Sequence, residues 1–190
     1  MSKEVSRRYF CRVALAGLFL MGRRQTVADA THSCSSGEET PEETEGPYFK
    51  PRSPERQSLL EPGIEGHRLV LSGLVMDPSC VRLPRVMLDF WQADAAGEYD
   101  NSGFRLRDHQ FTDDQGRYRL ETIVPGVYPG RTRHIHVKVR TRGTTILTSQ
   151  LYFPGEVLNP GDWLFRQDLL LTVMDAGETM RARFDFVVTA

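Results

Sequence analysis

Cysteine and long apolar runs are both scarce in this sequence. Of its 190 residues three are Cys, and none of them stands in a CxxC pair or in a Cys/His spacing typical of zinc sites. Cysteine is therefore not expected to bind a metal here. The apolar run from Val13 to Met21 has nine residues, whereas a helix needs about 20 to cross a bilayer, so we expect no stable membrane span.

An excess of positive charge is also missing, and this excludes one class of partner. The formal net charge is −1 at pH 7, and because the first thirty residues are basic, the remaining chain is acidic. An acidic body lacks the positive surface that nucleic-acid binding requires. Aromatic and charged residues, at 9% and 26%, occur at levels ordinary for a globular domain.

The first thirty residues contain the parts of an export signal. A basic stretch with paired arginines, from Ser6 to Phe10, precedes the apolar run, and the small-residue motif Ala28-Asp29-Ala30 follows it. Paired arginines before an aromatic residue resemble a twin-arginine signal, which exports folded proteins. We expect residues 1–30 to be cleaved after Ala30, placing the protein in the periplasm or outside the cell. The alternative is a cytoplasmic protein with a basic N-terminus.

Two cysteines would remain after such a cleavage, because Cys11 would leave with the signal. Cys34 and Cys80 form an even pair, and in an exported protein such a pair could be a disulfide. Two unpaired thiols fit the sequence equally well.

The rest of the chain divides into an acidic arm and one domain. Residues 31–44 are polar and rich in acids, which predicts a flexible arm. In residues 45–190, short runs of alternating apolar and polar residues are separated by Gly, Pro, Asp and Asn. With almost no helical periodicity, these runs predict an all-β sandwich.

The expected strands lie at residues 68–76, 85–92, 117–123, 130–139, 147–153 and 183–188. Phe111-Thr112, a turn at residues 113–116 and the strand 117–123 predict a hairpin. Residues 158–168 are expected to hold a short helix or turn.

Two histidines and two tyrosines form the pattern that indicates chemistry. His134 and His136 are two residues apart in a strand, so their side chains share one face. Tyr128 stands six residues before His134, and Tyr99 ends the stretch WQADAAGEY. Taken singly, each of these residues is more often structural than functional, since buried histidines usually satisfy a local hydrogen bond. The combination is more specific and suggests a metal site.

The donor types indicate which metal such a site would hold. Imidazole binds Zn, Cu, Fe and Ni, whereas a phenolate is a hard anionic oxygen. Two phenolates and two neutral imidazoles favour Fe(III) over Fe(II), and no Asp or Glu stands where a two-histidine, one-carboxylate Fe(II) site would need it. An alternative is zinc or copper on the histidine strand, with the tyrosines structural.

Four stretches resemble one known family, the intradiol ring-cleavage dioxygenases. These are non-haem Fe(III) enzymes that include the protocatechuate and catechol dioxygenases. The stretches are TEGPYF (44–49), DFWQADAAGEYDN (89–101), HQFTDDQGRYRLETIVPGVYPGRTRHIHVKV (109–139) and LTSQLYFPGE (147–156). The family fold is an antiparallel β-sandwich, in agreement with the strand pattern.

The resemblance implies roles for individual residues. Tyr99 and His134 would be equatorial iron ligands, and Tyr128 and His136 axial ones. Tyr128 would also be a general base, released from the iron when substrate binds. The positions of Arg131 and Gln150 match family residues, and Arg131 would stabilise negative charge on the substrate. The resemblance further implies that Gly46 and Pro47 line the substrate pocket.

The implied reaction is cleavage of a catechol-type ring between its two hydroxyl-bearing carbons by O2, giving a cis,cis-muconate-type product. Two departures from the family concern the substrate and the oligomer interface. Residues 31–44 are too short for the helical dimerisation region of the catechol-specific branch, and the loop Pro129 to Arg133 is compact. The substrate's ring substituents and any homo-oligomer interface therefore stay open. An alternative function is an exported, non-catalytic β-sandwich that binds small aromatics or a partner protein.

Overall fold

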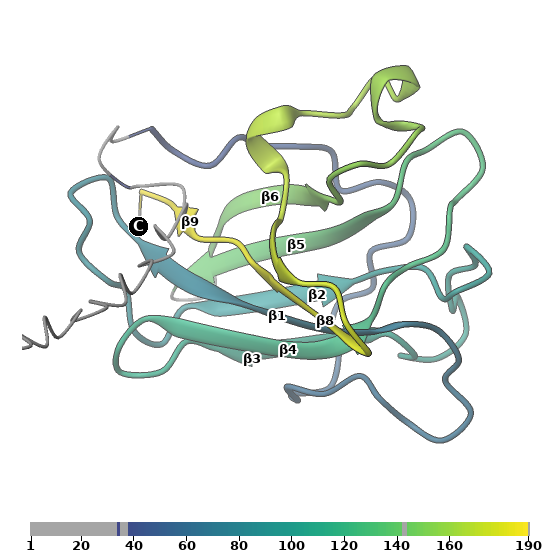
Figure 1. Cartoon of the computed structure of the whole chain (residues 1–190). Helices are drawn as coiled ribbons and strands as arrows, with labels where there is room; N and C mark the ends of the chain where they lie inside the picture. The colour runs from purple at the N-terminus through teal and green to yellow at the C-terminus, as the bar shows by residue number, and fades with distance from the viewer. Residues whose placement is uncertain (1–33, 35–37, 142–143, 190) are drawn as a thin grey trace, which may run out of the picture.

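The computed structural model describes residue 34 and the ranges 38–141 and 144–189 (Figure 1). The expected export signal at residues 1–30 lies outside the described residues and stays a prediction. Within the described part of the chain, no helix combines the length and the hydropathy needed to span a membrane.

Two β-sheets make up the fold, which confirms the expected all-β sandwich (Figure 1). The first sheet has the order β4-β1-β8-β7, with β9 paired to β1. Its strands are β1 (Arg68–Met76), β4 (Arg117–Ile123), β7 (Thr172–Asp175), β8 (Thr179–Arg183) and β9 (Phe186–Val187). The second has the order β3-β2-β5-β6, made of β2 (Met87–Trp91), β3 (Arg107–Phe111), β5 (His134–Thr141) and β6 (Thr144–Tyr152). Two 3-10 turns follow, η2 (Asn159–Gly161) and η3 (Gln167–Leu169), within and beside the stretch expected to hold a short helix or turn.

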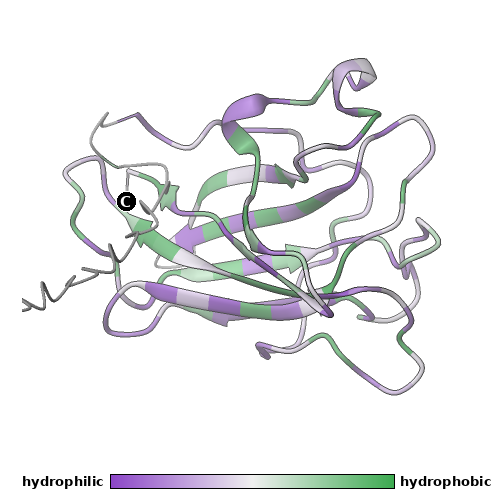
Figure 2. Ribbon diagram, viewed as in Figure 1, coloured by the Kyte–Doolittle hydropathy of each residue, from purple (hydrophilic) through white to green (hydrophobic). Residues whose placement is uncertain are grey.

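The core lies between the two sheets and is built from alternate residues of the strands. In β1 the buried apolar side chains recur at every second position, Leu69 and Leu71 among them. Figure 2 shows the same alternation of hydrophilic and hydrophobic residues along β4 and β5. Because strand side chains alternate between faces, one face of each strand supplies the core.

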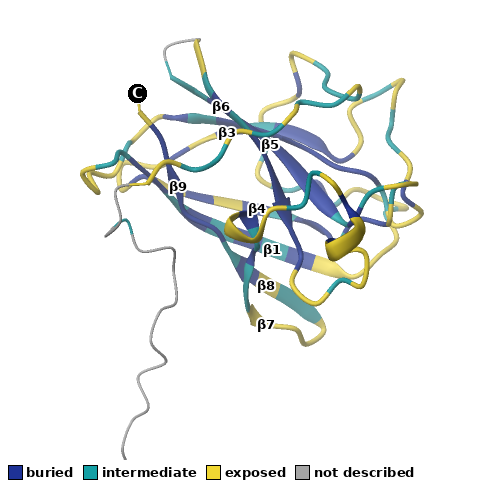
Figure 3. Ribbon diagram, turned by 90° about the horizontal axis from the view of Figure 1, so that it is seen from above, coloured by how far each residue is buried: buried dark blue, intermediate teal, exposed yellow. Residues whose placement is uncertain are grey.

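One strand departs from this alternation, since both faces of β5 are buried (Figure 3). Its outer face is covered by the N-terminal segment that precedes β1, since Glu45 pairs with Lys138 and the Phe49 ring lies 3.7 Å from the Lys138 ammonium. Farther along, the segment pairs with the edge strand β3 through backbone hydrogen bonds from Arg56 N to His109 O (3.0 Å) and from His109 N to Pro54 O (3.0 Å). A polar strand face is thereby enclosed, and that face carries the candidate metal site.

Two of the expected local arrangements are wrong. The turn at residues 113–116 forms, with Gly116 N donating to Asp113 O (2.9 Å), but the strands on either side do not pair as a hairpin. Instead β3 pairs with β2 and β4 pairs with β1 in the other sheet. The crossing lets Tyr118 and Leu120 of β4 enter the core between the sheets. The sheets are also not purely antiparallel, because β1 pairs in parallel with β8 and β9.

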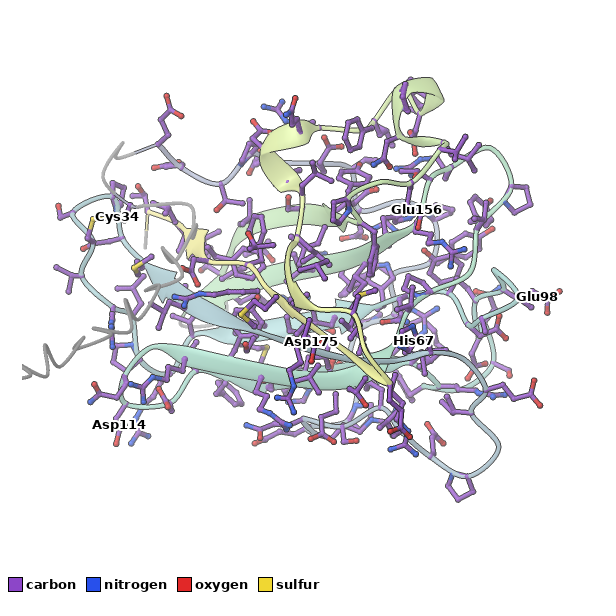
Figure 4. All side chains as sticks on the ribbon, in the orientation of Figure 1. Cys34, His67, Glu98, Asp114, Glu156 and Asp175 are labelled. Atoms are coloured by element: carbon purple, nitrogen blue, oxygen red, sulfur yellow. A yellow bond between two sulfur atoms is a disulfide. The ribbon has the colours of Figure 1, made fainter. Side chains whose placement is uncertain are left out.

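The described part of the acidic arm, residues 38–44, is tied to both sheets and so differs from the expected flexible segment. Thr40 N donates to Val187 O (2.8 Å), and Glu43 N donates to Thr148 O (2.8 Å). The acidic side chains can remain in water while the extended backbone completes the sheet edges. Near the start of this segment, Cys34 and Cys80 form a disulfide with their Cα atoms 5.5 Å apart, and Figure 4 labels Cys34.

Candidate metal centre

Strand β5 brings the two predicted histidines together. His134 and His136 point to the outer face, and their Nε2 atoms are 3.1 Å apart. His136 stands opposite Trp91 of β2 and Gln150 of β6. The indole of Trp91 stacks on the His136 ring, with centroids 4.8 Å apart and planes at 5°. Both rings are therefore fixed by the sheet and its neighbours.

Both imidazoles are held in the neutral form that binds metals. His134 Nδ1 donates to Thr132 O (2.7 Å), which leaves its Nε2 lone pair free to face the site. Burial lowers the pKa of His134 to about 4, and burial followed by the neighbouring His134 lowers the pKa of His136 as well. The Nδ1 atom of His136 is buried without a hydrogen-bond partner among the described residues.

Tyr99 reaches the same point from the loop that follows β2. Its hydroxyl lies 3.4 Å from His134 Nε2. The loop is shaped by carboxylates: Asp94 Oδ1 accepts from the backbone of Ala96 and Glu98. Burial raises the pKa of Tyr99, although the charge of Arg131 opposes the shift. The phenol therefore keeps its proton at neutral pH unless a bound metal ion displaces that proton.

The loops of the two predicted tyrosine ligands pack backbone against backbone. Gly97 has φ +86°, and a Cβ there would lie 2.1 Å from Val127 O. A Cβ on Gly126 would lie 2.4 Å from Ala95 O, and Gly126 N donates to Asp94 O (2.6 Å). Only glycine fits at these positions, so the loop sequences WQADAAGEY and VPGVYP place Tyr99 and Tyr128 side by side.

Tyr128 lies beside the histidine pair, but its hydroxyl has a different partner. It is 2.9 Å from the hydroxyl of Tyr48, a hydrogen bond that raises the pKa of Tyr48. The rings of Tyr128 and Tyr99 have centroids 6.0 Å apart. Of the four predicted ligands, the structure thus brings Tyr99, His134 and His136 into contact and places Tyr128 next to them.

Arg131 and Gln150 also meet, and Arg131 has a further partner that the sequence did not reveal. Arg131 Nε donates to both carboxylate oxygens of Asp162 (3.0 and 2.9 Å), and its Nη2 donates to Gln150 Oε1 (2.7 Å). Burial would raise the pKa of Asp162, but hydrogen bonds from the backbone of Thr132 and Leu164 and from Arg131 hold it below its usual range. Asp162 therefore stays ionised and fixes the arginine.

Gly46 and Pro47 stand at the edge of the same cluster. Gly46 has φ +69°, and a Cβ there would be 3.4 Å from Cε1 of His136. Pro47 is exposed. The next residue, Tyr48, was missed as a site residue although it belongs to the TEGPYF stretch; its ring stacks on Tyr99 with centroids 4.3 Å apart.

Arg133 joins two loops at this end of the molecule. Its Nη1 donates to Pro125 O (2.9 Å), and its Nε is 3.1 Å from a carboxylate oxygen of Glu156. Figure 4 shows Glu156 and Glu98 at one end of the molecule and Asp114, in the β3–β4 turn, at the other. The long loops that carry the candidate site are gathered at the former end.

These residues fit a hard, highly charged metal ion. Two ring nitrogens and a phenol oxygen converge within 3.4 Å, and a second phenol lies beside them. Within the described ranges, no group of three or more His, Cys, Asp or Glu could hold a metal. Any negative charge that this cluster offers a metal ion would therefore come from its tyrosines.

Comparisons with known proteins agree with this geometry. A family model described as "Dioxygenase" matches residues 44–190. A catechol 1,2-dioxygenase from Acinetobacter guillouiae is 27% identical, over 84% of this chain and 62% of its own length. The chain spans about half to three fifths of the length of several curated relatives that it matches.

Solved structures show the same similarity. The dioxygenase domain of a dioxygenase and carbohydrate-binding protein fusion from Streptomyces sp. SirexAA-E is 53% identical, over 79% of this chain and 97% of that chain, with a TM-score of 0.76. The 3-chlorocatechol 1,2-dioxygenase from Rhodococcus opacus 1CP is 28% identical, over 82% of this chain and 74% of that chain, with a TM-score of 0.72.

Proposed function

The chain belongs to the intradiol dioxygenases, and on that premise we propose that it cleaves a catechol-type ring between the two hydroxyl-bearing carbons with O2. The product would be a cis,cis-muconate-type acid. One observation carries the proposal: Tyr99, His134 and His136 converge on one point beside Tyr128. Substrate, product and iron are parts of this proposal.

Iron would be held by the four predicted ligands. Neutral His134 and His136 offer ring nitrogens, and Tyr99 and Tyr128 would bind as phenolates. Bound Fe(III) would supply the Lewis acidity that stabilises a catechol dianion and makes its ring reactive toward O2. The high pKa of Tyr99 in the protein alone means that metal binding must release a proton.

In this proposal Tyr128 would move a proton. Its hydroxyl hydrogen-bonds to the hydroxyl of Tyr48 (2.9 Å), which would give Tyr128 a partner other than the metal. As a phenolate, Tyr128 would accept a proton from one substrate hydroxyl. Tyr48 would then orient the resulting phenol.

Arg131 would stabilise negative charge on the substrate. Its guanidinium is anchored by the bidentate contact with Asp162 and by Gln150, and its side chain is 13% exposed. A fixed cation in a site with little water acts more strongly than a mobile one, because no reorganisation is needed as charge develops. Asp162 and Gln150 are positioning residues in this arrangement.

We also propose export as the cellular location. The supporting observations are the N-terminal motif of residues 6–30 and the Cys34–Cys80 disulfide, since disulfides persist mainly in oxidising compartments. Cell fractionation of a natively expressed protein tests this. A full-length product that stays in the cytoplasmic fraction would contradict it.

The function is tested on protein purified after expression with iron. We expect about one iron per chain, a visible tyrosinate-to-iron absorption band, and oxygen uptake with at least one of catechol, protocatechuate and hydroxyquinol. A Tyr99→Phe variant should alter the band. Iron-free, colourless protein would reject the proposal, and so would zinc or copper in place of iron. Coloured iron protein with no ring cleavage would favour a non-catalytic binding role.

A further inference from the structure

Arg107, the first residue of β3, is one of the most deeply buried side chains of the described chain. It is 1% exposed. Its Nη1 donates to Tyr48 O (2.5 Å), while its Nε and Nη2 both donate to Asp100 O (3.2 and 3.1 Å). One guanidinium therefore joins two segments that are far apart in the sequence.

Both of these segments carry a tyrosine of the candidate site. Asp100 directly follows Tyr99, and the Tyr48 and Tyr99 rings stack at 4.3 Å with planes at 13°. The guanidinium carbon of Arg107 is 5.9 Å from the Tyr99 ring centroid. Because Tyr48 also bonds to Tyr128, the position of Arg107 affects the surroundings of both predicted tyrosine ligands.

No carboxylate of the described residues lies within ion-pair distance of Arg107, although the charges of Asp100 and Asp89 act on it from farther away. Among the described residues it makes no ion pair, and its acceptors are two backbone carbonyls. Arg131, the other arginine of the site, has Asp162. Burial of an unpaired cation is costly, and hydrogen bonds to neutral carbonyls do not cancel its charge. A Tyr99 phenolate would add a negative charge beside the guanidinium, whose carbon is 5.9 Å from the Tyr99 ring centroid.

We propose that Arg107 is a positioning residue of the metal centre, which fixes the Tyr48 segment to the Tyr99 loop and offsets the charge of the Tyr99 phenolate. Only the second part, the offset of the phenolate charge, rests on the proposed function. The fixing of the two segments is a property of the protein without metal. An arginine suits both tasks because its planar fork reaches two acceptors at once, whereas a lysine offers a single ammonium.

Arg56 provides a matched control. It too spans segments through backbone carbonyls, donating from Nη2 to Phe104 O (2.7 Å) and to Arg107 O (3.1 Å). No contact joins Arg56 to any tyrosine of the site among the described residues. Unlike Arg107, Arg56 also pairs with a carboxylate, Glu61 (3.3 Å). An Arg56→Met variant therefore removes a bridge in the same region, including its bond to the Arg107 backbone, without removing a contact to Tyr48 or Tyr99.

The experiment compares wild type with Arg107→Met, Arg107→Lys and Arg56→Met. In the Met variant of Arg107, iron should be lost to a chelator about 10- to 100-fold more readily, the range typical of residues that support metal ligands. Its tyrosinate band should move to longer wavelength, because the phenolate loses a nearby positive charge. In iron-free protein, the backbone amides of residues 48–49 and 99–101 should exchange hydrogen faster.

The Lys variant separates charge from geometry. It keeps the positive charge, so its band should stay close to the wild-type wavelength, while the two segments should still exchange faster. Arg56→Met should match wild type in band and exchange at these segments. The proposal is overturned if Arg107→Met matches Arg56→Met in both measurements.

Failure of the proposed function gives a different result. If wild-type protein binds no iron, the exchange measurement on iron-free protein still decides whether Arg107 fixes the two segments. If Arg107→Met does not fold, the Lys variant carries the test, and wild-type exchange in that variant overturns the proposal.

Discussion

The two faces of strand β5 are almost equally buried, yet they are chemically opposite. The inner face carries apolar side chains that are 0% exposed: Ile135, Val137 and Val139. The outer face carries polar side chains that are 5%, 3% and 6% exposed: His134, His136 and Lys138. Burial by itself thus does not tell which face is core and which is site.

The difference lies in how each face is stabilised. Inner side chains gain from leaving water and need no directed partner. Each outer side chain has a specific partner. His134 donates to Thr132 O, His136 stacks on Trp91, and the ammonium of Lys138 lies 3.7 Å from the centre of the Phe49 ring. Polar burial of this kind stabilises little and instead holds groups in place for binding. Substitutions on the two faces should therefore affect different properties.

The largest effect is expected for His136→Gln on the outer face. Gln is also polar but cannot replace an imidazole as an iron ligand. Loss of a residue that merely supports a metal ligand can lower activity about 100-fold, so loss of the ligand itself should lower it further. Thermal unfolding of the iron-free protein should change little. Iron content and oxygen uptake are measured together, and full iron occupancy with normal turnover would contradict the assignment of His136.

Ile135→Ala on the inner face should do the reverse. Removing a fully buried side chain leaves a cavity and should lower the free energy of unfolding by about 2–5 kcal/mol. Turnover per bound iron should stay near wild type in the folded fraction. Denaturant unfolding and steady-state kinetics check this pair of results, and an activity loss without a stability loss would show that the two faces are not separable.

The outer face should also make the iron-free protein sensitive to acid. Burial lowers the pKa of His134 to about 4, so the folded state stays unprotonated while the unfolded histidine binds a proton below about pH 6.5. The unfolded state then binds more protons, and stability falls as the pH drops from about 6.5 toward 4. His134 should contribute a loss of about 2 kcal/mol between pH 7.5 and 5.

Urea unfolding of iron-free protein at several pH values measures this loss. A His134→Gln variant, which has no group titrating in this range, should show a flatter dependence by that amount. Equal slopes in wild type and variant would mean that folding does not shift the pKa of His134.

The smallest effect is expected for Lys138→Met, farther along the outer face. Lys138 pairs with Glu45, whose side chain is 43% exposed, so solvent already screens the carboxylate. Met loses both the ion pair and the cation–π contact of the ammonium with the Phe49 ring, which together should lower stability by about 1 kcal/mol. Unfolding in low and high salt measures it. A much larger loss of unfolding free energy would show that contacts of the outer face stabilise the fold.

Sequence reasoning succeeded where a pattern is local. Alternation along β5 placed His134 and His136 on one face, and the glycine-containing stretch before Tyr99 predicted a loop. It failed where the partner is distant. Nothing near Asp162 marks it as the anchor of Arg131, which lies 31 residues away. Strand pairing is a second case. Which strands pair, as β1 does in parallel with β8, depends on how the apolar faces are best buried. A turn sequence such as the one between β3 and β4 does not reveal this.

The glycine contacts between the two tyrosine loops have a consequence for engineering. Since Gly97 and Gly126 leave no room for a side chain between the backbones, the loops form one mechanical unit. A library that varies Gly97 or Gly126 would create backbone clashes in most members. Exchanging both loops together, with their glycines, would keep this packing while the other loop residues change.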